Sequence, residues 1–297
     1  MRPIGIFLAG LAMASPTGVG GAGLAPAPLA RPIRVMSLNQ CTDQLVLALL
    51  PPGRIASVTS LSRDPETSLL YREALKVGVN HGLAEEVVAQ HPDLVIVGSF
   101  STPSTRNMLK RLAYPMVEVG GADSFEQIRE VTRQVAKAVG EPARGEAMIA
   151  RMDRQLAVLA RDPGPPLRVA AWDGAGFTAG DGTLYDTVLK AAGAINVTNE
   201  PPSNANGKPD AEALLVTAPA LLVKGAGFHR KPGLQDNVER HPLVRRYWDG
   251  ARTMTIRQAY YVCGTPRIAE AVFLLRQELR AAAARVRTPL PFATRRP

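Results

Sequence analysis

The chain has 297 residues, of which 46% are hydrophobic and 21% charged, and its formal net charge is +9. This composition is typical of a globular protein and excludes both a disordered and a fibrous chain. The positive charge is spread along the sequence apart from an arginine-rich C-terminal tail. No basic stripe with interleaved aromatic residues is present, so we do not expect nucleic-acid binding.

The first 30 residues differ in composition from the rest of the chain. Arg2 is followed by the apolar run 4–13 and then by small residues and prolines, with Ala-Pro-Ala at 25–27. This order is typical of a secretory signal peptide. The apolar run is shorter than the roughly 20 residues that a membrane-spanning helix needs. We therefore expect residues 1–30 to be a signal peptide and the mature protein to be exported.

After this segment, the hydrophobic pattern predicts strands that alternate with helices. The predicted strands and helices of the first half lie at 33–38, 42–50, 55–59, 84–91, 94–98, 116–119 and 124–139. Those of the second half lie at 167–172, 183–192, 194–198, 211–217, 220–225, 236–247, 254–256 and 265–285. Such alternation predicts an α/β fold with mostly parallel sheets.

One stretch of the sequence occurs twice. Residues 84–100 read AEEVVAQHPDLVIVGSF, and residues 211–227 read AEALLVTAPALLVKGAG. Each copy predicts a short helix, a proline turn and a buried strand that ends in a loop of small residues. Two similar α/β units in tandem predict two Rossmann-like lobes with a ligand cleft between them.

A long helix is predicted between the two units. Pro142–Ala160 carries apolar residues at helical spacing, and the segment 162–166, rich in proline and glycine, ends it. About 19 helical residues span roughly 28 Å, which is enough to run from one lobe to the other. We expect an N-terminal lobe over 31–140, the inter-lobe helix over 141–162 and a C-terminal lobe over 163–297.

The candidate ligand-binding residues follow the predicted strands, because ligands of open parallel sheets bind beyond the carboxyl ends of the strands. In the first lobe these are Asn39, Gln40, Cys41, Arg63, His81, Ser99 and Phe100. In the second lobe they are Trp172, Phe177, Phe228, His229, Tyr260, Tyr261 and Cys263.

Cys41 and Cys263 are the only cysteines, and they fall in different predicted lobes. For an exported protein a structural disulfide is the default, and here it would join one lobe to the other. The alternative is a pair of thiols that contact a bound metal complex together with His81 and His229. No short Cys/His spacing predicts a metal site of the protein's own, and we expect neither a resident metal nor a cofactor.

The paired acidic residues of the repeat, Glu85 and Glu212, also have two interpretations. An acid in the first turn of a helix complements the helix dipole by roughly 0.3–1 kcal/mol. The alternative is a pair of equivalent carboxylates offered to arginines of a partner protein. The residues alone favour the first interpretation.

Catalytic motifs are absent from the sequence. Gly174-Ala175-Gly176 follows a predicted strand as in a dinucleotide site, but the next helix begins only near Thr183, too late to aim its N-terminus at a pyrophosphate. The enzyme alternatives are a thiol oxidoreductase that uses Cys41 and Cys263 and a nucleotide-dependent Rossmann enzyme that uses the Gly174–Gly176 loop.

Several segments together carry a family resemblance over residues 32–285. They are RVMSLNQCTDQLVLAL, RIASVT, NHGLAEEVVAQHPDLVIVG, the long helix, AEALLVTAPALLV and TPRIAEAVFLL. In this order they resemble the class III periplasmic substrate-binding proteins of ABC importers for ferric siderophores, haem and cobalamin. The resemblance implies two lobes joined by one rigid helix, with the ligand held between them, and no catalysis. The cysteine pair is not general to that family.

The resemblance also implies a location and partners. It places the family's importer-docking glutamates on Glu85 and Glu212, which reverses the preference for the helix-dipole interpretation. We expect a periplasmic monomer that captures a metal chelate, iron–siderophore first and cobalamin or haem next. It would deliver the chelate to an inner-membrane permease that works with a cytoplasmic ATPase.

Overall fold

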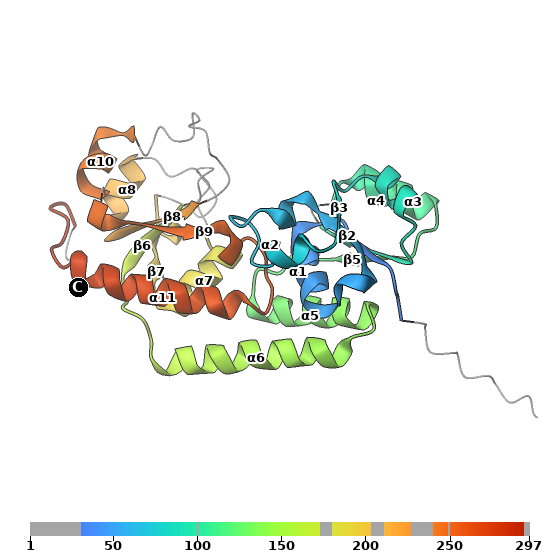
Figure 1. Cartoon of the computed structure of the whole chain (residues 1–297). Helices are drawn as coiled ribbons and strands as arrows, with labels where there is room; N and C mark the ends of the chain where they lie inside the picture. Colours follow the sequence, from blue (N-terminus) through green and yellow to red (C-terminus); the bar gives the residue numbers. More distant parts are fainter. Residues whose placement is uncertain are drawn as a thin grey trace, which may run out of the picture. The chain divides into compact units, whose positions relative to one another are not determined.

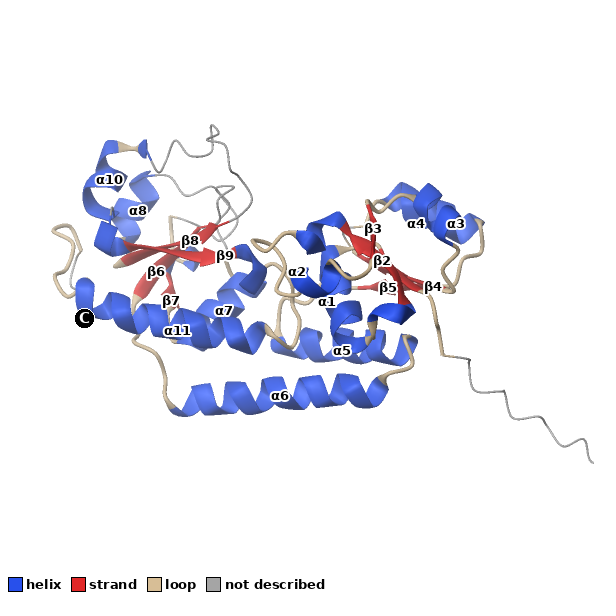
Figure 2. Cartoon of the chain, in the orientation of Figure 1, coloured by secondary structure: helices blue, strands red, loops and turns tan. Residues whose placement is uncertain are grey.

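The computed structural model describes residues 31–99, 101–172, 180–202, 211–226, 240–248 and 250–293. The chain divides into two units, Met1–Arg31 and Pro32–Pro297. Only Arg31 of the first unit is described, so the expected signal peptide lies outside the described residues. All the helices and strands described below belong to the second unit (Figure 2).

The N-terminal lobe contains a five-stranded parallel sheet in the order β3-β2-β1-β4-β5. Its strands are β1 (Val35–Ser37), β2 (Ile55–Thr59), β3 (Gly78–Asn80), β4 (Leu94–Gly98) and β5 (Met116–Val119). Its helices are α1 (Gln40–Leu49), α2 (Tyr71–Ala74), α3 (Ala84–Gln90), α4 (Pro103–Arg111) and α5 (Phe125–Ala138), with 3₁₀ turns η1 (Pro52–Arg54) and η2 (Ser60–Arg63).

The C-terminal lobe contains a four-stranded parallel sheet in the order β7-β6-β8-β9. Its strands are β6 (Arg168–Trp172), β7 (Ile195–Asn196), β8 (Leu221–Ala226) and β9 (Thr253–Arg257). Its helices are α7 (Leu184–Ala192), α8 (Ala211–Thr217), α10 (Pro242–Trp248) and α11 (Ile268–Arg285), with 3₁₀ turns η3 (Val197–Asn199), η5 (Gly250–Arg252) and η6 (Gln258–Tyr260). The predicted α/β fold with two parallel sheets is confirmed.

Alternation along the strands places a helical layer on each face of both sheets, because successive strand residues point to opposite faces. In β4, Ile96 packs into the core under α1 and α5, whereas Val95 and Val97 pack into the core under α3 and α4. In β8, Leu221 and Val223 pack with α7 and α11, whereas Leu222 packs with α8 and α10.

The internal repeat is confirmed as two equivalent units, α3–β4 and α8–β8. His91 and Ala218 stand at the same position of the two copies, and each has φ +45° at the end of its helix. The N–H of His91 donates to Val87 O at 3.0 Å, and that of Ala218 donates to Leu214 O at 2.9 Å. Each helix therefore ends in a left-handed residue before its proline and turns into the strand beside β1 or β6.

Helix α6 (Pro142–Arg161) joins the two sheets in the chain and contacts helices of both lobes (Figure 1). It contacts α5 closely at Gly145, because a Cβ there would lie 2.5 Å from the Cβ of Ala136. Further along, Met152 and Leu159 are buried in the core that contains α7 and α11. The helix is therefore not absorbed into one lobe.

Arg276 of α11 fixes the carboxyl end of α6. Its side chain is buried and donates to the carbonyl oxygens of Leu159 and Asp162 near the end of α6, and of Ala191 and Ala192 at the end of α7. Carbonyls in the last turn of a helix have no partner within the helix, so one guanidinium satisfies two helix ends. Burial lowers the pKa of Arg276.

Some predicted helix starts are wrong. Helix α1 begins at Gln40, two residues before the predicted start at 42, and is capped by Asn39, whose Oδ1 accepts from the Cys41 N–H at 2.9 Å. Helix α11 begins at Ile268, three residues after the predicted start at 265. The segment after β2, for which no helix is predicted, contains the 3₁₀ turn η2.

Candidate functional site

The carboxyl ends of three strands of the first sheet open onto one small cavity of about 70 Å³. Its wall includes Asn39 after β1, Ser99 after β4 and Gly120 after β5, together with Leu184 and Gly264 of the C-terminal lobe. Small-molecule sites usually measure about 300–1,000 Å³, so this space alone is too small for a metal chelate. We interpret the cavity as the bottom of a candidate ligand site between the two lobes, and we call it the cleft floor.

A disulfide between Cys41 and Cys263 crosses the cleft floor, with an S–S distance of 2.12 Å and a Cα–Cα distance of 5.0 Å. Cys41 lies in the first turn of α1, and Cys263 lies between η6 and α11, so the bond joins the two lobes. The structure agrees with the disulfide interpretation. The alternative of two thiols that contact a bound metal complex is contradicted, because each sulfur is bonded to the other.

Hydrogen bonds to backbone carbonyls reinforce this junction between the lobes. The Ala259 N–H donates to Glu66 O at 2.9 Å, and the Thr187 hydroxyl donates to Asp123 O at 2.7 Å. Gly264 is tightly packed: a Cβ at this position would lie 2.0 Å from the carbonyl oxygen of Ala122. Only glycine fits this approach, which brings the segment after β5 against the segment after Cys263.

A buried carboxylate supports the floor from the N-terminal lobe. Asp43 lies two residues after Cys41 and is fully buried. Its Oδ2 accepts from the Thr59 N–H at 2.9 Å, the Thr59 hydroxyl at 2.5 Å and the Ser62 hydroxyl at 2.8 Å. Burial raises the pKa of Asp43 from 3.8 to about 6, although the hydroxyls of Ser37, Thr59 and Ser62 partly lower it. Asp43 thus ties α1 to the turn after β2.

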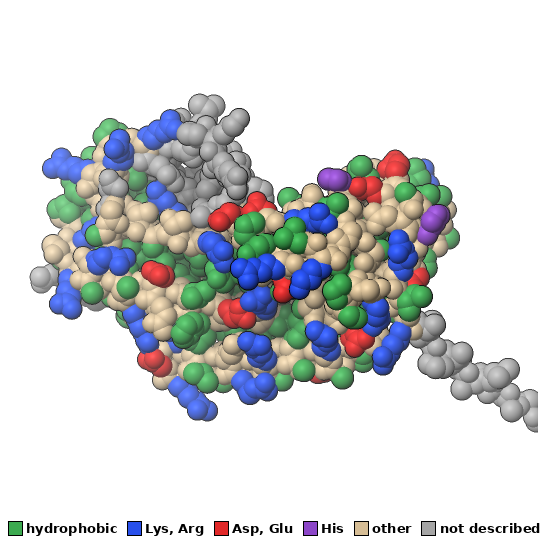
Figure 3. Space-filling model, in the orientation of Figure 1, with side chains coloured by type: hydrophobic (Ala, Val, Ile, Leu, Met, Phe, Trp, Pro, Cys, Tyr) green, Lys and Arg blue, Asp and Glu red, His purple; other side chains and the backbone are tan. Residues whose placement is uncertain are grey.

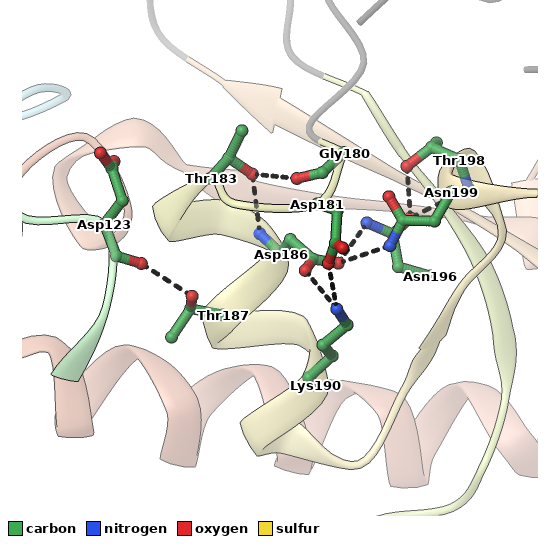
Figure 4. A network of polar contacts seen from close by, with 10 residues as sticks. All are labelled: Asp123, Gly180, Asp181, Thr183, Asp186, Thr187, Lys190, Asn196, Thr198 and Asn199. Atoms are coloured by element: carbon green, nitrogen blue, oxygen red, sulfur yellow. Dashed lines mark hydrogen bonds and ion pairs between the residues drawn. The ribbon is translucent and has the colours of Figure 1, made fainter. Parts of the chain in front are cut away.

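A second polar network supports the floor from the C-terminal lobe (Figure 4). Thr183 caps α7 by accepting from the Asp186 N–H at 3.2 Å. Asp186 is buried and accepts from Asn196 Nδ2 at 2.8 Å and from Lys190 Nζ at 2.7 Å. Hydrogen bonds to Asp181 and Asp186 raise the pKa of Lys190. This network fixes the first turn of α7, whose Leu184 lines the cavity.

Of the predicted ligand-binding residues, Gln40 and Tyr261 are buried, as is Cys263 of the disulfide. The Gln40 side chain donates to Thr67 O at 2.6 Å. Tyr261 stacks on Tyr185 with ring centroids 4.4 Å apart. In this structure the side chains of Gln40 and Tyr261 lie in the layer that supports the floor and do not line the cavity, and their contact with a ligand stays a prediction.

Three other predicted residues lie at the carboxyl edges of the sheets. Arg63, at the end of η2, is half-buried and donates to Val77 O at 2.7 Å. His81, after β3, is exposed, and its Nδ1 lies 2.9 Å from Glu86 Oε1. Tyr260, at the end of η6, is partly exposed, and its hydroxyl lies 3.2 Å from Nη2 of Arg257.

Several predicted residues lie outside the described part of the chain. They are Phe100, Phe177, Phe228, His229 and the Gly174–Gly176 loop. For Trp172 the backbone is described, and it pairs with Lys224 at the end of β6, but its side chain is not described.

The two glutamates of the repeat occupy equivalent places. Glu85 is exposed in the first turn of α3, and Glu212 is exposed in the first turn of α8. Two residues further along each helix, Val87 and Leu214 are both buried. The repeat therefore presents one carboxylate to solvent from the same position of each lobe.

Asp43, the Gly120-Gly121 loop and the Asp123–Thr187 contact are not among the residues predicted from the sequence. A glycine pair directly after a predicted strand was a usable signal for the loop. Asp43 gave no signal, because an acid in the first turn of a helix is ordinary in sequence.

No group of three or more His, Cys, Asp or Glu residues that could hold a metal ion occurs among the described residues. Within the same residues, none of the helices is both long enough and apolar enough to cross a membrane.

Solved structures with a similar fold are periplasmic binding proteins. The periplasmic heme-binding protein RhuT from Roseiflexus sp. RS-1 in apo form has 23% identity and a TM-score of 0.71, covering 84% of this chain and 98% of its own. The vitamin B12 binding protein BtuF of Vibrio cholerae has 16% identity and a TM-score of 0.64, covering 85% and 98%. An ABC-type Fe³⁺-hydroxamate transport system structure from Saccharomonospora viridis has 17% identity and a TM-score of 0.62, covering 83% and 92%.

These identities are below 25%, so the structural likeness establishes the fold alone. Among curated proteins, no sequence matched. The family model described as periplasmic binding protein matches residues 35–247, which is more than half of the chain. The protein therefore belongs to the periplasmic binding protein family.

Proposed function

We propose that the protein is the periplasmic substrate-binding component of an ABC importer and performs no catalysis. It captures a metal chelate between the two lobes and delivers it to an inner-membrane permease with a cytoplasmic ATPase. The observation that carries this proposal is the cleft floor, where the carboxyl ends of β1, β4 and β5 meet the C-terminal lobe. Ligands of open parallel sheets bind at such edges, and membership of the periplasmic binding protein family supports a binding role for this one.

The class of chelate that we propose follows from the charge at the two sheet edges and from the ligands for which similar structures are named. Structures with this fold are named for heme, vitamin B12 and Fe³⁺-hydroxamate. In this chain, Arg63 after β2 and Arg257 at the end of β9 bring positive charge to the two sheet edges. Positive edges favour an anionic ferric complex, so we place iron–siderophore first and cobalamin or haem next.

A calorimetric titration tests the ligand. The probes are a ferric tris-catecholate siderophore, whose complex is anionic, the same siderophore without iron, cyanocobalamin and haemin. We expect saturable one-to-one binding of the ferric complex and at least tenfold weaker binding of the metal-free form. Ser99→Trp should weaken binding at least tenfold, because Ser99 lines the floor. Ser104→Trp is the matched control. Ser104 is an exposed residue of α4, and its substitution should leave ligand affinity unchanged. Failure of all four probes to bind would contradict the proposal.

The partner is tested through Glu85 and Glu212, which we propose form salt bridges with permease arginines. The double variant Glu85→Ala/Glu212→Ala should abolish uptake and leave ligand affinity unchanged. The control is Glu130→Ala/Glu278→Ala, which also removes one exposed glutamate from each lobe. Equal uptake by the two double variants would contradict the docking role.

The enzyme alternatives gain no support. Cys41 and Cys263 are joined in a disulfide that links two lobes, and Cys263 is buried. A thiol oxidoreductase needs an accessible thiolate to attack its substrate.

A further inference from the structure

A groove separates α6 from α11, away from the cleft floor. The two helices run in the same direction, because Arg151 lies 3.9 Å from Glu270 at one end and Arg280 lies 2.6 Å from Asp162 at the other. Between these ion pairs is a cavity of about 470 Å³. Its size is within the range of about 300–1,000 Å³ that is usual for small-molecule sites.

The centre of this groove is apolar. Val158 of α6 is 66% exposed and Phe273 of α11 is 50% exposed, and both line the cavity. The buried residues Leu159 and Ala269 also line it. In Figure 3, hydrophobic side chains and Lys or Arg side chains lie next to one another over this pair of helices. A large aromatic and an aliphatic side chain are thus exposed to solvent in one groove.

The charges around the cavity are unbalanced. Arg151, Arg154, Arg276 and Arg280 line it with a single acid, Asp162. Arg276 is satisfied by four carbonyls and Arg280 by Asp162.

The two remaining cations lie together. Arg154 has no ion pair or hydrogen bond with any residue in the described part of the chain, and Arg151, 69% exposed, reaches Glu270 only at 3.9 Å. These two arginines are three residues apart on α6, so they share a face of the helix. A pair of cations with little compensation therefore stands beside the apolar centre.

We propose that this groove binds a free amphipathic organic anion, such as a single-chain carboxylate. The head group lies on Arg151 and Arg154, where charge-assisted hydrogen bonds to guanidinium are strong. The apolar chain covers Val158 and Phe273. A neighbouring cavity of about 290 Å³ shares Arg151 and Gln155 and continues towards Met148, which gives room for longer chains. This site is independent of the ligand in the cleft.

The test is a calorimetric titration of the folded protein with laurate below its micelle concentration. Laurate should bind saturably with one equivalent per protein. Butyrate, which has the head without the chain, and dodecyltrimethylammonium, which has the chain with the opposite charge, should bind at least tenfold more weakly. Arg151→Glu/Arg154→Glu and Phe273→Ser should each weaken laurate binding at least tenfold.

Matched controls separate the site from general surface effects. Arg161→Glu changes an exposed arginine of α6 outside the groove, and Leu274→Ser changes the exposed neighbour of Phe273 that does not line it. Both should bind laurate as the unchanged protein does. Absence of saturable binding, equal binding of the cationic amphiphile, or equal losses in the control variants would overturn the proposal. Binding to anionic phospholipid vesicles without binding of monomeric laurate would also overturn it, because it would indicate a membrane-binding surface.

Discussion

The two lobes are connected in two ways that differ in chemistry. Helix α6 crosses between them once, and it is held by apolar packing against α5, α7 and α11 and by Arg276. The cleft floor crosses through a disulfide and through hydrogen bonds such as Ala259 N–H to Glu66 O. A single helix would leave the lobes free to hinge about its ends. The second connection restrains that motion next to the ligand edge, so we infer a cleft that opens only slightly.

Removing the disulfide should have the largest effect. Cys41 and Cys263 are 222 residues apart, so the cross-link restricts a long loop of the unfolded chain, an effect worth roughly 5 kcal/mol. Cys41→Ser/Cys263→Ser should lower the free energy of unfolding by about that amount, measured by denaturant titration. Amide hydrogen exchange should rise at 121–124 and 259–264, where the two lobes meet.

Reduction provides the control for this prediction. A reductant should destabilise the unchanged protein to the same extent and leave the double serine variant unaffected. Identical unfolding midpoints with and without the cross-link would show that the disulfide contributes nothing to stability. They would contradict the claim that this second connection restrains the lobes.

Breaking the other connection at Arg276 should have the next largest effect. Arg276→Met removes the charged donor of the Leu159, Ala191 and Ala192 carbonyls and leaves that of Asp162 with Arg280 alone, at a cost on the order of 4 kcal/mol. Denaturant titration measures the loss. Arg285→Met, in the exposed last turn of the same helix, should change stability by less than about 0.5 kcal/mol. Equal effects of the two substitutions would show that the guanidinium does not hold α6.

The smallest predicted effect is a pH dependence of the free energy of unfolding, which arises from Asp43 beneath the cleft floor. Because burial raises the pKa of Asp43 from 3.8 to about 6, the folded protein binds this proton more tightly than the unfolded chain. The stability contributed by the protonated group is complete below about pH 4 and is lost as the pH rises through about 6. The loss is at most about 3 kcal/mol, or 1.4 kcal/mol per pH unit.

Comparison with Asp43→Asn isolates this contribution from that of other carboxyls. Ion pairs lower the pKa of Glu118 and Asp162, and these groups change stability with the opposite sign. The stability of the unchanged protein minus that of the variant should fall between pH 4 and pH 6. A difference that stays flat over this range would contradict the raised pKa.

Much of the fold was predictable because it is encoded locally. The repeat at 84–100 and 211–227 carries the apolar spacing and the proline turn that define α3–β4 and α8–β8. The same holds for α6, whose apolar residues repeat at helical spacing and whose end is marked by proline and glycine.

The rest depends on contacts that sequence spacing does not record. Arg276 resembles any arginine of an amphipathic helix, yet two helix ends converge on it. Gln40 and Tyr261 follow strands, as ligand-facing residues do, but packing turns them inward. The α6–α11 groove has no sequence pattern, because it forms from two helices more than 100 residues apart.

The central claim, a metal chelate held between two lobes, is tested most directly on protein recovered from its own periplasm. The measurement is the iron and cobalt content of the purified protein, together with mass spectrometry of the retained ligand. We expect up to one equivalent of iron or cobalt in an organic chelate, released when the protein is unfolded. Protein from iron-limited cells that carries neither metal, and that no ferric chelate, cobalamin or haem stabilises, would contradict it.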